Sequence, residues 1–361
     1  MNVANGSVAT GPSEGKGRKI AVRVSNWIGD VIMNLPGLEL LRHHYPDAEI
    51  VAIARPWVRG ILSFRPDLVD RCIDFDDRGE AKSPLGFWRF ARGLREERFD
   101  MAVVFTKHLK GALMMWVAGI PVRVGFGTAE TRWFLNGHIM RKSLPKTGRH
   151  QSRDYLELLE RAGSLAPIEP SPLPRLDLDE NLARQVRETF LAGAGGPVLA
   201  VHAGAAFGTA KRWSAEGYAE TCRRFLERTG GTVILLGVPA EAEVNTLIEE
   251  TVADPGLRNL CGKTSLPESV ALISVSDGFL SNDSGLMHVA AAFAKPQVAV
   301  FGPTDIAATF PLNERARTVY HKVDCSPCFL RDCPIGHDCM KAVTPDEVSG
   351  EVNRLFSSKS D

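Results

Sequence analysis

The stretch Gly278-Phe-Leu-Ser-Asn-Asp-Ser-Gly-Leu-Met-His-Val-Ala-Ala-Ala-Phe293 decides the fold class of this chain. Gly278–Ser281 is an apolar run typical of a buried strand, and Ser284–Phe293 has a helical pattern whose small residues allow close packing on a sheet. Another apolar run, Val298–Gly302, follows within a few residues. Two strands joined by a helix in this way form a βαβ unit, so the stretch predicts a parallel sheet.

The same alternation of short apolar runs and helical patterns extends over the whole chain. In the first half we predict strands at Ile20–Val24, Ile50–Ala54, Cys72–Phe75, Met101–Phe105 and Val122–Gly125, with helices at Leu35–Tyr45 and Phe87–Arg98. The second half begins again with strands at Val198–His202 and Thr232–Gly237 and a helix at Ala215–Arg228. The pattern predicts an α/β protein of two Rossmann-like domains facing each other across a cleft, with ligands at the carboxyl ends of the strands.

A segment with several prolines, Ala166–Pro174, interrupts the alternation and is typical of a linker. The predicted organisation is a disordered lead at 1–18, a first domain at 19–165, a linker at 166–178, a second domain at 179–343 and a C-terminal helix and tail at 344–361. We expect the helix at Pro345–Phe356 to pack across the cleft onto the first domain.

Composition excludes several classes of protein. Of the 361 residues 44% are hydrophobic and 24% are charged, which is average for a globular protein. No apolar run approaches the roughly 18 residues of a membrane span, and the N-terminus lacks the apolar core of a secretory signal, so we expect a cytoplasmic protein. The first predicted strand is followed by Asn26-Trp-Ile-Gly-Asp30, which lacks the glycine pattern of dinucleotide-binding or P-loop proteins.

Positive charge is concentrated in one part of a neutral chain. Residues 86–153 contain thirteen Lys or Arg, among them Lys107 and Lys110, against four Asp or Glu. Such an excess predicts an anionic partner: a phosphorylated lipid, a nucleic acid or a polyphosphate. The alternative for any single residue is a solvated helix face.

Two motifs follow predicted strands and carry polar side chains. In Ser25-Asn-Trp-Ile-Gly-Asp-Val31, Asp30 has the position of a general base at a strand's carboxyl end or of a helix N-cap, and both roles can coexist. In Asn282–His288, Asp283 or Ser284 caps the following helix, and the amides of Ser284 and Gly285 form an anion site toward which His288 points. The alternative is a capped helix with a buried histidine.

A third motif, His202-Ala-Gly-Ala-Ala-Phe-Gly-Thr-Ala-Lys-Arg-Trp213, is a small-residue loop that ends in two cations. Loop amides at Gly204 and Ala205 together with Lys211 suit a diphosphate, although a surface loop with a basic end would have the same pattern. Glu241 and Glu243 follow the next strand, where a carboxylate accepts hydrogen bonds from ribose hydroxyls.

Four clustered cysteines, Cys325, Cys328, Cys333 and Cys339, have a spacing compatible with a structural zinc ion. The alternative is four reduced thiols packed in a loop, and this is the outcome we expect. If the cysteines hold zinc, we expect chelation to loosen the region before the last helix and to leave the chemistry of the loop at His202–Trp213 intact, because the cluster lies outside the three motifs.

The motifs taken together resemble a known family. Asp283-Ser-Gly-Leu-Met-His288, with Val298-Ala-Val-Phe-Gly-Pro-Thr304 after it, resembles the signature of glycosyltransferase family 9. Gly204–Trp213 resembles the donor loop of the heptosyltransferase II branch of that family. Asn26–Val31, with Tyr45-Pro46 and Arg55-Pro-Trp57, resembles the branch's N-terminal region, and the resemblance extends from about Ile20 to Val348.

The resemblance implies a GT-B fold and an inverting, metal-independent transfer without a cofactor. It implies that Asp30 is the catalytic base and that Lys211 contacts the diphosphate of the donor. The matching positions in the nucleotide-phosphate motif are Asp283, Ser284, Gly285 and His288. Thr264 matches a position near the adenine, and Glu241 or Glu243 a nucleoside contact. Ala205 and Ala206 replace hydroxyl residues of some members, which leaves backbone amides of the loop, including that of Gly204, to bind phosphate.

The implied reaction moves heptose from ADP-heptose to heptose I of the inner core of lipopolysaccharide. The partners are then ADP-heptose, a lipid A–Kdo–heptose acceptor bound by the first domain at Asn26, Lys107 and Lys110, and the cytoplasmic face of the inner membrane, with no nucleic acid. Two alternatives are another GT-B transferase or an epimerase with a different nucleotide sugar, and a non-catalytic relative that binds nucleotide or lipopolysaccharide.

Overall fold

The computed structural model describes residues 17–144 and 148–357, so nearly all of the predicted lead at 1–18 lies outside the described residues. The chain divides into two compact units, Met1–Pro174 (unit 1) and Arg175–Asp361 (unit 2). The division falls at the end of the proline-bearing segment Ala166–Pro174, and residues 166–178 contain no helix or strand. None of the helices in the described ranges is long and apolar enough to cross a membrane.

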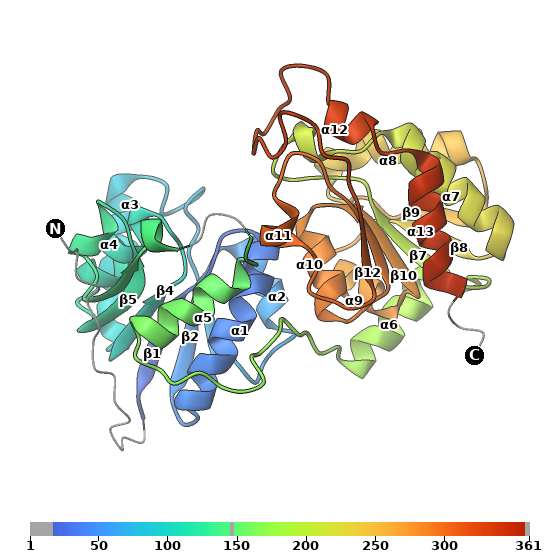
Figure 1. Cartoon of the computed structure of the whole chain (residues 1–361). Helices are drawn as coiled ribbons and strands as arrows, with labels where there is room; N and C mark the ends of the chain where they lie inside the picture. The colour runs from blue at the N-terminus through green and yellow to red at the C-terminus, as the bar shows by residue number, and fades with distance from the viewer. Residues whose placement is uncertain (1–16, 145–147, 358–361) are drawn as a thin grey trace. The chain divides into compact units, whose positions relative to one another are not determined.

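Unit 1 is built on a parallel sheet of six strands in the order β3-β2-β1-β4-β5-β6 (Figure 1). The strands are β1 (Lys19–Arg23), β2 (Glu49–Ala54), β3 (Arg71–Asp74), β4 (Met101–Val104), β5 (Val122–Gly127) and β6 (Gly137–Met140). The α-helices are α1 (Ile28–His44), α2 (Pro56–Leu62), α3 (Pro84–Gly93), α4 (Leu109–Val117) and α5 (Ser152–Arg161), and short 3-10 turns are η1 (Leu94–Glu97), η2 (Thr131–Trp133) and η3 (Arg141–Ser143).

Helices cover both faces of this sheet. α3 and α4 lie together on one face, where Phe87, Ala91 and Met115 join the core formed by strand residues such as Val51 and Val104. α1, α2 and α5 lie on the other face (Figure 1). Because both faces are covered, inner strands such as β2 and β4 carry buried apolar residues in succession rather than in alternation with polar ones.

Unit 2 repeats this architecture with a parallel sheet in the order β12-β11-β10-β7-β8-β9. Its strands are β7 (Val198–His202), β8 (Thr232–Leu235), β9 (Leu257–Asn259), β10 (Gly278–Asn282), β11 (Gln297–Val300) and β12 (Ala316–Val319). The α-helices are α6 (Glu180–Phe190), α7 (Ala215–Thr229), α8 (Ala242–Val252), α9 (Leu266–Val275), α10 (Gly285–Ala292), α11 (Ile306–Thr309), α12 (Asp338–Lys341) and α13 (Pro345–Ser357), with short 3-10 turns η4 (Thr209–Lys211) and η5 (Pro239–Glu241).

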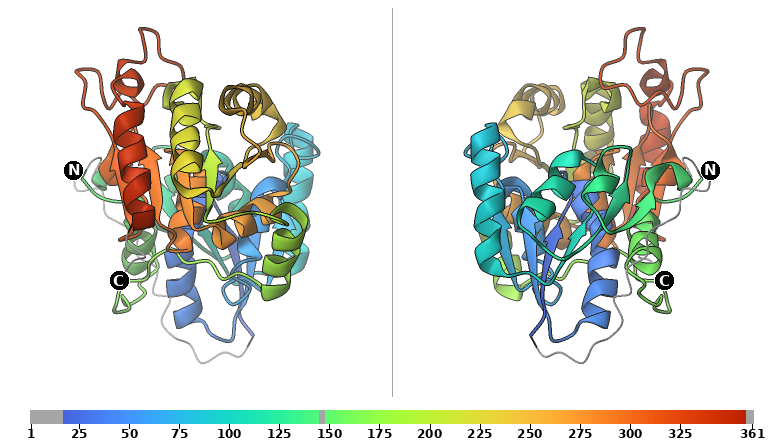
Figure 2. Two further views of the ribbon diagram at one scale, coloured as in Figure 1. Left: turned by 90° about the vertical axis from the view of Figure 1, so that its right-hand side faces the viewer. Right: turned by 90° about the vertical axis from the view of Figure 1, so that its left-hand side faces the viewer.

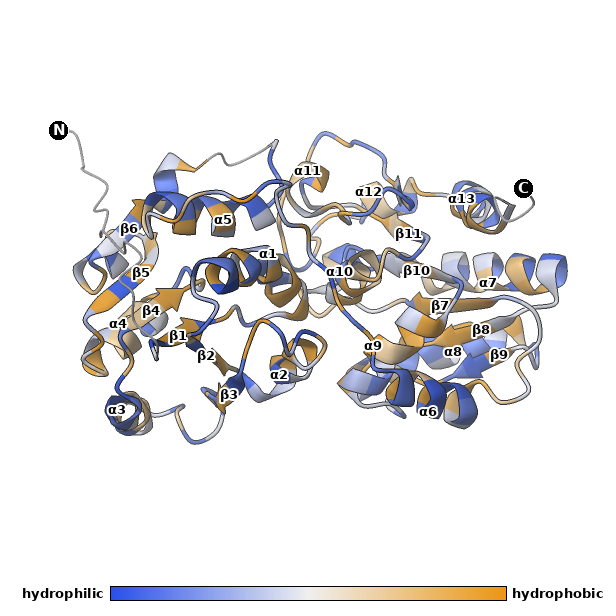
Figure 3. Cartoon of the chain, turned by 90° about the horizontal axis from the view of Figure 1, so that it is seen from below, coloured by the Kyte–Doolittle hydropathy of each residue, from blue (hydrophilic) through white to orange (hydrophobic). Residues whose placement is uncertain are grey.

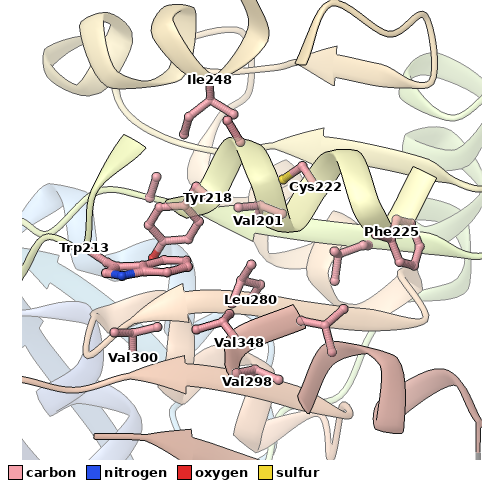
Figure 4. Close-up of a cluster of buried hydrophobic side chains, with 14 of the residues drawn as sticks. Val201, Trp213, Tyr218, Cys222, Phe225, Ile248, Leu280, Val298, Val300 and Val348 are labelled. Carbon is pink, nitrogen blue, oxygen red and sulfur yellow. The ribbon is translucent and has the colours of Figure 1, made fainter. Parts of the chain in front are cut away.

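The C-terminal helix α13 belongs to the core of unit 2. It packs beside α7 and against β10, β11 and β12, as both views in Figure 2 show for α7 and α13. Figure 4 shows Val348 of α13 in the same buried cluster as Tyr218 and Phe225 of α7. The expectation that this helix packs on the first domain was therefore wrong, because its apolar face is needed to cover the second sheet.

Several element bounds differ from the sequence predictions for identifiable reasons. α1 begins at Ile28 rather than Leu35, with Pro36 inside the helix and buried. The strands β6, β9 and β12 were not predicted, because segments such as Leu257-Arg-Asn259 have too few apolar residues to form a recognisable run. The hydropathy pattern did allow the other elements to be predicted. Figure 3 shows mainly hydrophobic strands, and helices such as α7 with hydrophobic and hydrophilic residues in alternation.

The two sheets have the same connectivity. Each unit's first and fourth strands, β1 and β4 or β7 and β10, are neighbours at the point where the strand order reverses direction. In doubly wound α/β sheets, ligands bind outside the carboxyl ends of the strands at this topological switch point. Each unit therefore has one edge at which a site is expected.

Candidate active site

At the switch point of unit 2, the loop after β7 meets the start of α10. Lys211 Nζ lies 2.6 Å from Asp283 Oδ2, although the two residues are 72 positions apart. Thr304 Oγ1 donates to the same oxygen at 2.6 Å. Asp283 is 4% exposed, and the Lys211 side chain 14%. An ammonium has three donors, so this pair positions Lys211 and leaves donors for a ligand.

Asn282, the last residue of β10, binds both ends of the loop His202–Trp213, which carries Lys211. Its Nδ2 donates to Ala203 O at 2.8 Å and to Gly204 O at 3.2 Å, and its Oδ1 accepts from Trp213 N at 3.0 Å. Asn282 is fully buried, so a polar side chain here requires these partners. It thereby fixes both ends of the loop.

His202 connects the loop to two neighbouring elements. Its Nδ1 lies 3.2 Å from Ser284 Oγ, and its Nε2 lies 3.3 Å from Glu241 Oε2. If Nε2 carries the proton and donates to the carboxylate, Nδ1 accepts from the Ser284 hydroxyl. Burial alone would raise the pKa of Glu241, but the hydrogen bonds from His202 and from the Val238 amide hold that pKa below its ordinary value.

The structure separates the two glutamates that the sequence left as alternatives. Glu241 is 5% exposed and lies directly against Gly204, where a Cβ would come within 1.8 Å of Glu241 Oε1. Glu243 is exposed in the first turn of α8. Glu241 is therefore the glutamate that the fold brings to the loop, and Gly204 is the residue type that permits this approach.

The remaining predicted donor residues of unit 2 surround this edge or lie near it. Ser284 occupies the N-cap of α10, but its side chain makes no capping bond and Asp283 is engaged by Lys211, so the predicted side-chain cap is absent. Ala205 and His288 are 1% and 6% exposed. Thr264 lies between β9 and α9, and its hydroxyl is 2.7 Å from Ser269 Oγ. The amide of Gly285 opens α10.

In unit 1, Asp30 is the third residue of α1 rather than its N-cap. Trp27 occupies the N-cap without a side-chain bond, so the capping role considered for Asp30 was wrong. Gln151 Nε2 lies 3.5 Å from Asp30 Oδ1 and donates to Tyr155 Oη at 3.1 Å. Burial first, and then the charge of Asp30, raise the pKa of Tyr155, which therefore remains a neutral phenol beside the carboxylate.

The predicted acceptor residues of unit 1 have different surroundings. Lys107 Nζ lies 3.3 Å from Asp154 Oδ2, and Arg149 also pairs with Asp154, at 2.5 Å. These ion pairs with an acid just beyond residue 153 neutralise part of the positive excess found in 86–153. Asn26 Oδ1 accepts from Arg23 Nη2 at 2.6 Å, and Lys110 lines a cavity with Asn26.

Comparison with known proteins places the chain in a family. The family model described as glycosyltransferase family 9 (heptosyltransferase) matches residues 87–338. The chain belongs to glycosyltransferase family 9. Glycosyltransferase activity and the predicted class of two Rossmann-like units, as in the GT-B fold, are thereby confirmed.

Relatives in this family match nearly the whole chain. The lipopolysaccharide heptosyltransferase 2 of Escherichia coli K12 is 33% identical over 94% of this chain and 98% of its own length. The lipooligosaccharide heptosyltransferase 2 of Haemophilus influenzae is 30% identical over 92% and 97%. The structure of E. coli ADP-heptose lipopolysaccharide heptosyltransferase II superposes with a TM-score of 0.81 at 29% identity, covering 95% of this chain and all of that one.

The segment that carries the four clustered cysteines, Cys325–Cys339 (the cysteine segment), is hydrogen-bonded to the loop after β7. Arg331 O accepts from Ala210 N at 2.9 Å, and Arg331 Nε donates to Phe207 O at 2.8 Å. Thr209 Oγ1 donates to Asp332 Oδ1 at 2.7 Å. The prediction that chelation leaves the chemistry of this loop intact did not include these hydrogen bonds, which connect the two segments.

The cysteines themselves are all free thiols. Within residues 17–144 and 148–357, no group of three or more His, Cys, Asp or Glu is arranged to hold a metal ion. Backbone N–H groups of Ile335 and His337 lower the pKa of Cys333, whereas burial raises that of Cys339.

Sequence reasoning missed the residues that hold the site together. His202, Asn282 and Thr304 appeared only as members of quoted strands or motifs, and no role was predicted for their side chains. The available signal was a polar side chain at the end of an otherwise apolar strand, as at His202 and Asn282. Because such a residue becomes buried, it needs partners from other segments.

Proposed function

We propose that this glycosyltransferase is an inverting heptosyltransferase that transfers heptose from ADP-heptose to heptose I of the lipopolysaccharide inner core. Similarity to heptosyltransferase 2 proteins over more than nine-tenths of both chains supports this assignment. The structural observation that supports this assignment most directly is the Lys211–Asp283 ion pair. It holds a cation beside the first backbone amides of α10, and a cation next to a helix N-terminus is suited to bind a diphosphate.

On the donor side, Lys211 and the amides of Ser284 and Gly285 stabilise the departing diphosphate of ADP. Negative charge develops on the leaving group in the transition state, and preorganised donors lower the energy of that charge. Glu241 is suited to accept hydrogen bonds from ribose hydroxyls, since His202 keeps it ionised. Thr264 is the proposed contact near the adenine.

On the acceptor side, Asp30 acts as the general base. As the acceptor hydroxyl oxygen forms its bond to the anomeric carbon, the carboxylate takes the hydroxyl proton and the bond to ADP breaks, with inversion at that carbon. Asn26, Lys107 and Lys110 are the proposed acceptor contacts. We further propose that the enzyme acts as a peripheral protein at the cytoplasmic face of the inner membrane.

The decisive experiment measures ADP release by the purified protein with ADP-heptose and two acceptors. We expect release with core lipid that carries heptose I, and little release with the same lipid lacking heptose. Release only with another nucleotide sugar would favour a transferase with a different donor. ADP binding without any transfer would favour the non-catalytic alternative.

A further inference from the structure

The helix α3 of unit 1 has a buried face and an exposed face. Phe87 and Ala91 on the buried face belong to the core that covers the sheet. The exposed face carries, at the spacing of successive helical turns, Leu85, Trp88, Arg89 and Arg92. Leu85 is 69% exposed and Trp88 40%. Because the opposite face already covers the sheet, these two apolar side chains are not accounted for by the packing of unit 1.

Two more exposed tryptophans lie in the same layer of unit 1. The helix α4 packs beside α3, and the turn η2 packs against α4 (Figure 1). Trp116 of α4 is 48% exposed and contacts the ring of Phe134, with ring centroids 5.6 Å apart. Trp133 of η2 is 72% exposed. Three of the six tryptophans of the chain are therefore exposed on one layer, whose inner side forms a single core.

The charges that accompany these apolar residues are positive. Residues 82–95 contain four Lys or Arg and no Asp or Glu. Among the residues that the structure describes, neither Arg89 nor Arg92 forms an ion pair. The guanidinium of Arg132 lies over the ring of Trp133, 4.8 Å from its centroid. The surface is therefore complementary to a partner that has anionic groups above an apolar interior.

An anionic phospholipid bilayer has this chemistry. Indole rings favour the headgroup level of a membrane, where one part of the ring is in apolar and the other in wet surroundings. Arginine keeps its aliphatic stem in apolar surroundings while its guanidinium binds lipid phosphate. Protein interfaces usually gather their apolar residues in a core without charges, whereas here Trp88 and Trp133 each follow or precede an arginine in the sequence. The pattern thus favours a bilayer over a protein partner.

The exposed apolar residues include two at the edge of the sheet where Asp30 lies. The sheet is parallel, so segments that follow strands begin at its carboxyl edge. α3 begins after β3 and η2 comes after β5, which brings Leu85 and Trp133 to the edge at which Asp30 follows β1. A lipid-linked acceptor that is anchored in a bilayer beside this layer would present its sugars near that edge.

We infer that the outer surface of α3, α4 and η2, consisting of Leu85, Trp88, Arg89, Arg92, Trp116, Arg132 and Trp133 (the docking surface), binds an anionic phospholipid bilayer. The tryptophans enter the headgroup level, and the arginines contact lipid phosphates. Binding to the bilayer does not depend on the transfer reaction, whereas the use of this surface to reach a lipid-linked acceptor rests on the proposed function.

The first test measures flotation of the full chain with vesicles of phosphatidylethanolamine and phosphatidylglycerol that contain no glycolipid. We expect binding of the wild type, and at least about tenfold weaker partitioning with phosphatidylcholine vesicles or in the double variant Arg89→Gln/Arg92→Gln. The matched control is Arg184→Gln/Arg187→Gln, because these exposed arginines of α6 have the same spacing in unit 2. The control should partition like the wild type.

The apolar part of the docking surface is tested by Leu85→Ser/Trp88→Ser, which should also weaken partitioning. Leu247→Ser is its control, since Leu247 is an exposed apolar residue of α8 in unit 2. Thermal unfolding shows whether each variant is folded, and the arginine variant tests the surface without changing an apolar residue.

A second measurement locates the tryptophans in the bilayer. Vesicles with brominated acyl chains should quench the tryptophan fluorescence of the wild type. The quenching should fall in Trp88→Phe/Trp133→Phe and persist in Trp57→Phe, because Trp57 belongs to α2 on the other face of the sheet. Equal quenching in all three proteins would overturn the docking surface.

Other outcomes would also overturn the proposal. These are partitioning that is independent of lipid charge, or equal partitioning of the arginine variant and its control. Self-association in sedimentation velocity that is abolished by Leu85→Ser/Trp88→Ser, in a protein that does not bind vesicles, would show that this surface joins two copies of the chain.

Kinetics separate the docking surface from the proposed function. The arginine variant should have a raised KM for acceptor embedded in vesicles and an unchanged KM for a delipidated, water-soluble acceptor. Charge-dependent docking by a protein without transfer activity would leave the docking surface and remove the heptosyltransferase assignment. Active protein whose KM for embedded acceptor is unchanged in the variant would overturn the role of the surface in reaching the acceptor.

Discussion

Asp283 accepts two hydrogen bonds on one carboxylate oxygen, from Lys211 and from Thr304. A flexible lysine side chain loses conformational entropy when it is fixed. Because the buried Asp283 carboxylate already holds Lys211 in place, binding of a ligand causes little further loss of entropy there. On this account Lys211 contacts the diphosphate, and Asp283 and Thr304 position it. The same logic applies to His202, whose hydrogen bond positions Glu241.

Lys211→Ala should weaken ADP binding strongly, because a hydrogen bond to a charged group contributes about 1.5–3 kcal/mol. Asp283→Ala should also weaken it, by releasing the lysine, whereas Asp283→Asn should restore part of the affinity by keeping an acceptor for the Lys211 and Thr304 donors. Calorimetry with ADP measures all three. Equal affinity in Lys211→Ala and wild type would place the nucleotide elsewhere.

Asp30→Asn should lower turnover by about 10²–10⁴-fold, the usual contribution of a general base. ADP affinity should stay near that of the wild type, because Asp30 lies in unit 1 and the proposed donor residues lie in unit 2. Single-turnover kinetics with the heptose-I acceptor checks this. A folded variant that retains its turnover would show that Asp30 has only a structural role.

Glu241 predicts a pH dependence of stability. Its pKa in the folded protein lies below the ordinary value of 4.5, so its contribution is fully present above that pH and is lost as the pH falls through the folded-state pKa. Glu241→Gln should therefore flatten the decline in unfolding free energy below about pH 4.5. Urea unfolding across this range is the measurement, and parallel curves for variant and wild type would contradict it.

At the scale of elements, the cysteine segment and the loop after β7 act as one structure. Arg331 and Asp332, between Cys328 and Cys333, hydrogen-bond to the loop that carries Lys211. A connection of more than 120 residues along the chain leaves no local pattern, which is why the sequence did not predict it.

Local patterns did predict the elements around the site. The apolar runs located the strands β7 and β10, and the small residues after Ser284 located α10. They misplaced the start of α1 because Pro36 is tolerated inside that helix. The Lys211–Asp283 and His202–Glu241 contacts arise only when the sheet brings the ends of separate strands together. The sequence therefore predicted the motifs of the site but not these two contacts between them.

For the cysteine segment we expect four reduced thiols and no bound zinc in purified protein, measured by thiol titration and elemental analysis. Cys333 should alkylate fastest among the four, because backbone N–H groups lower its pKa. Its modification should weaken ADP binding, since Asp332 next to it holds Thr209. A Cys333→Ala variant serves as control, and a stoichiometric metal would contradict the expectation.

At the scale of the whole molecule, each unit has a sheet covered by helices on both faces and a core of its own. Such units are expected to fold independently. A fragment of residues 175–361 should therefore unfold cooperatively and bind ADP with nearly the affinity of the full chain, while showing no transferase activity. Circular dichroism and calorimetry test this, and a fragment without a cooperative transition would refute it.

The position of α13 in the core of unit 2 has a consequence for biosynthesis. Phe356 packs on Phe225 with ring centroids 5.0 Å apart, and Val348 and Val352 are buried beneath α7. Domains fold in the order in which they leave the ribosome. Unit 1 can thus mature while translation continues, but the second core stays incomplete until the final helix emerges. Premature termination before α13 would consequently release chains with a folded first unit and an exposed apolar sheet in the second, which cellular proteases should remove.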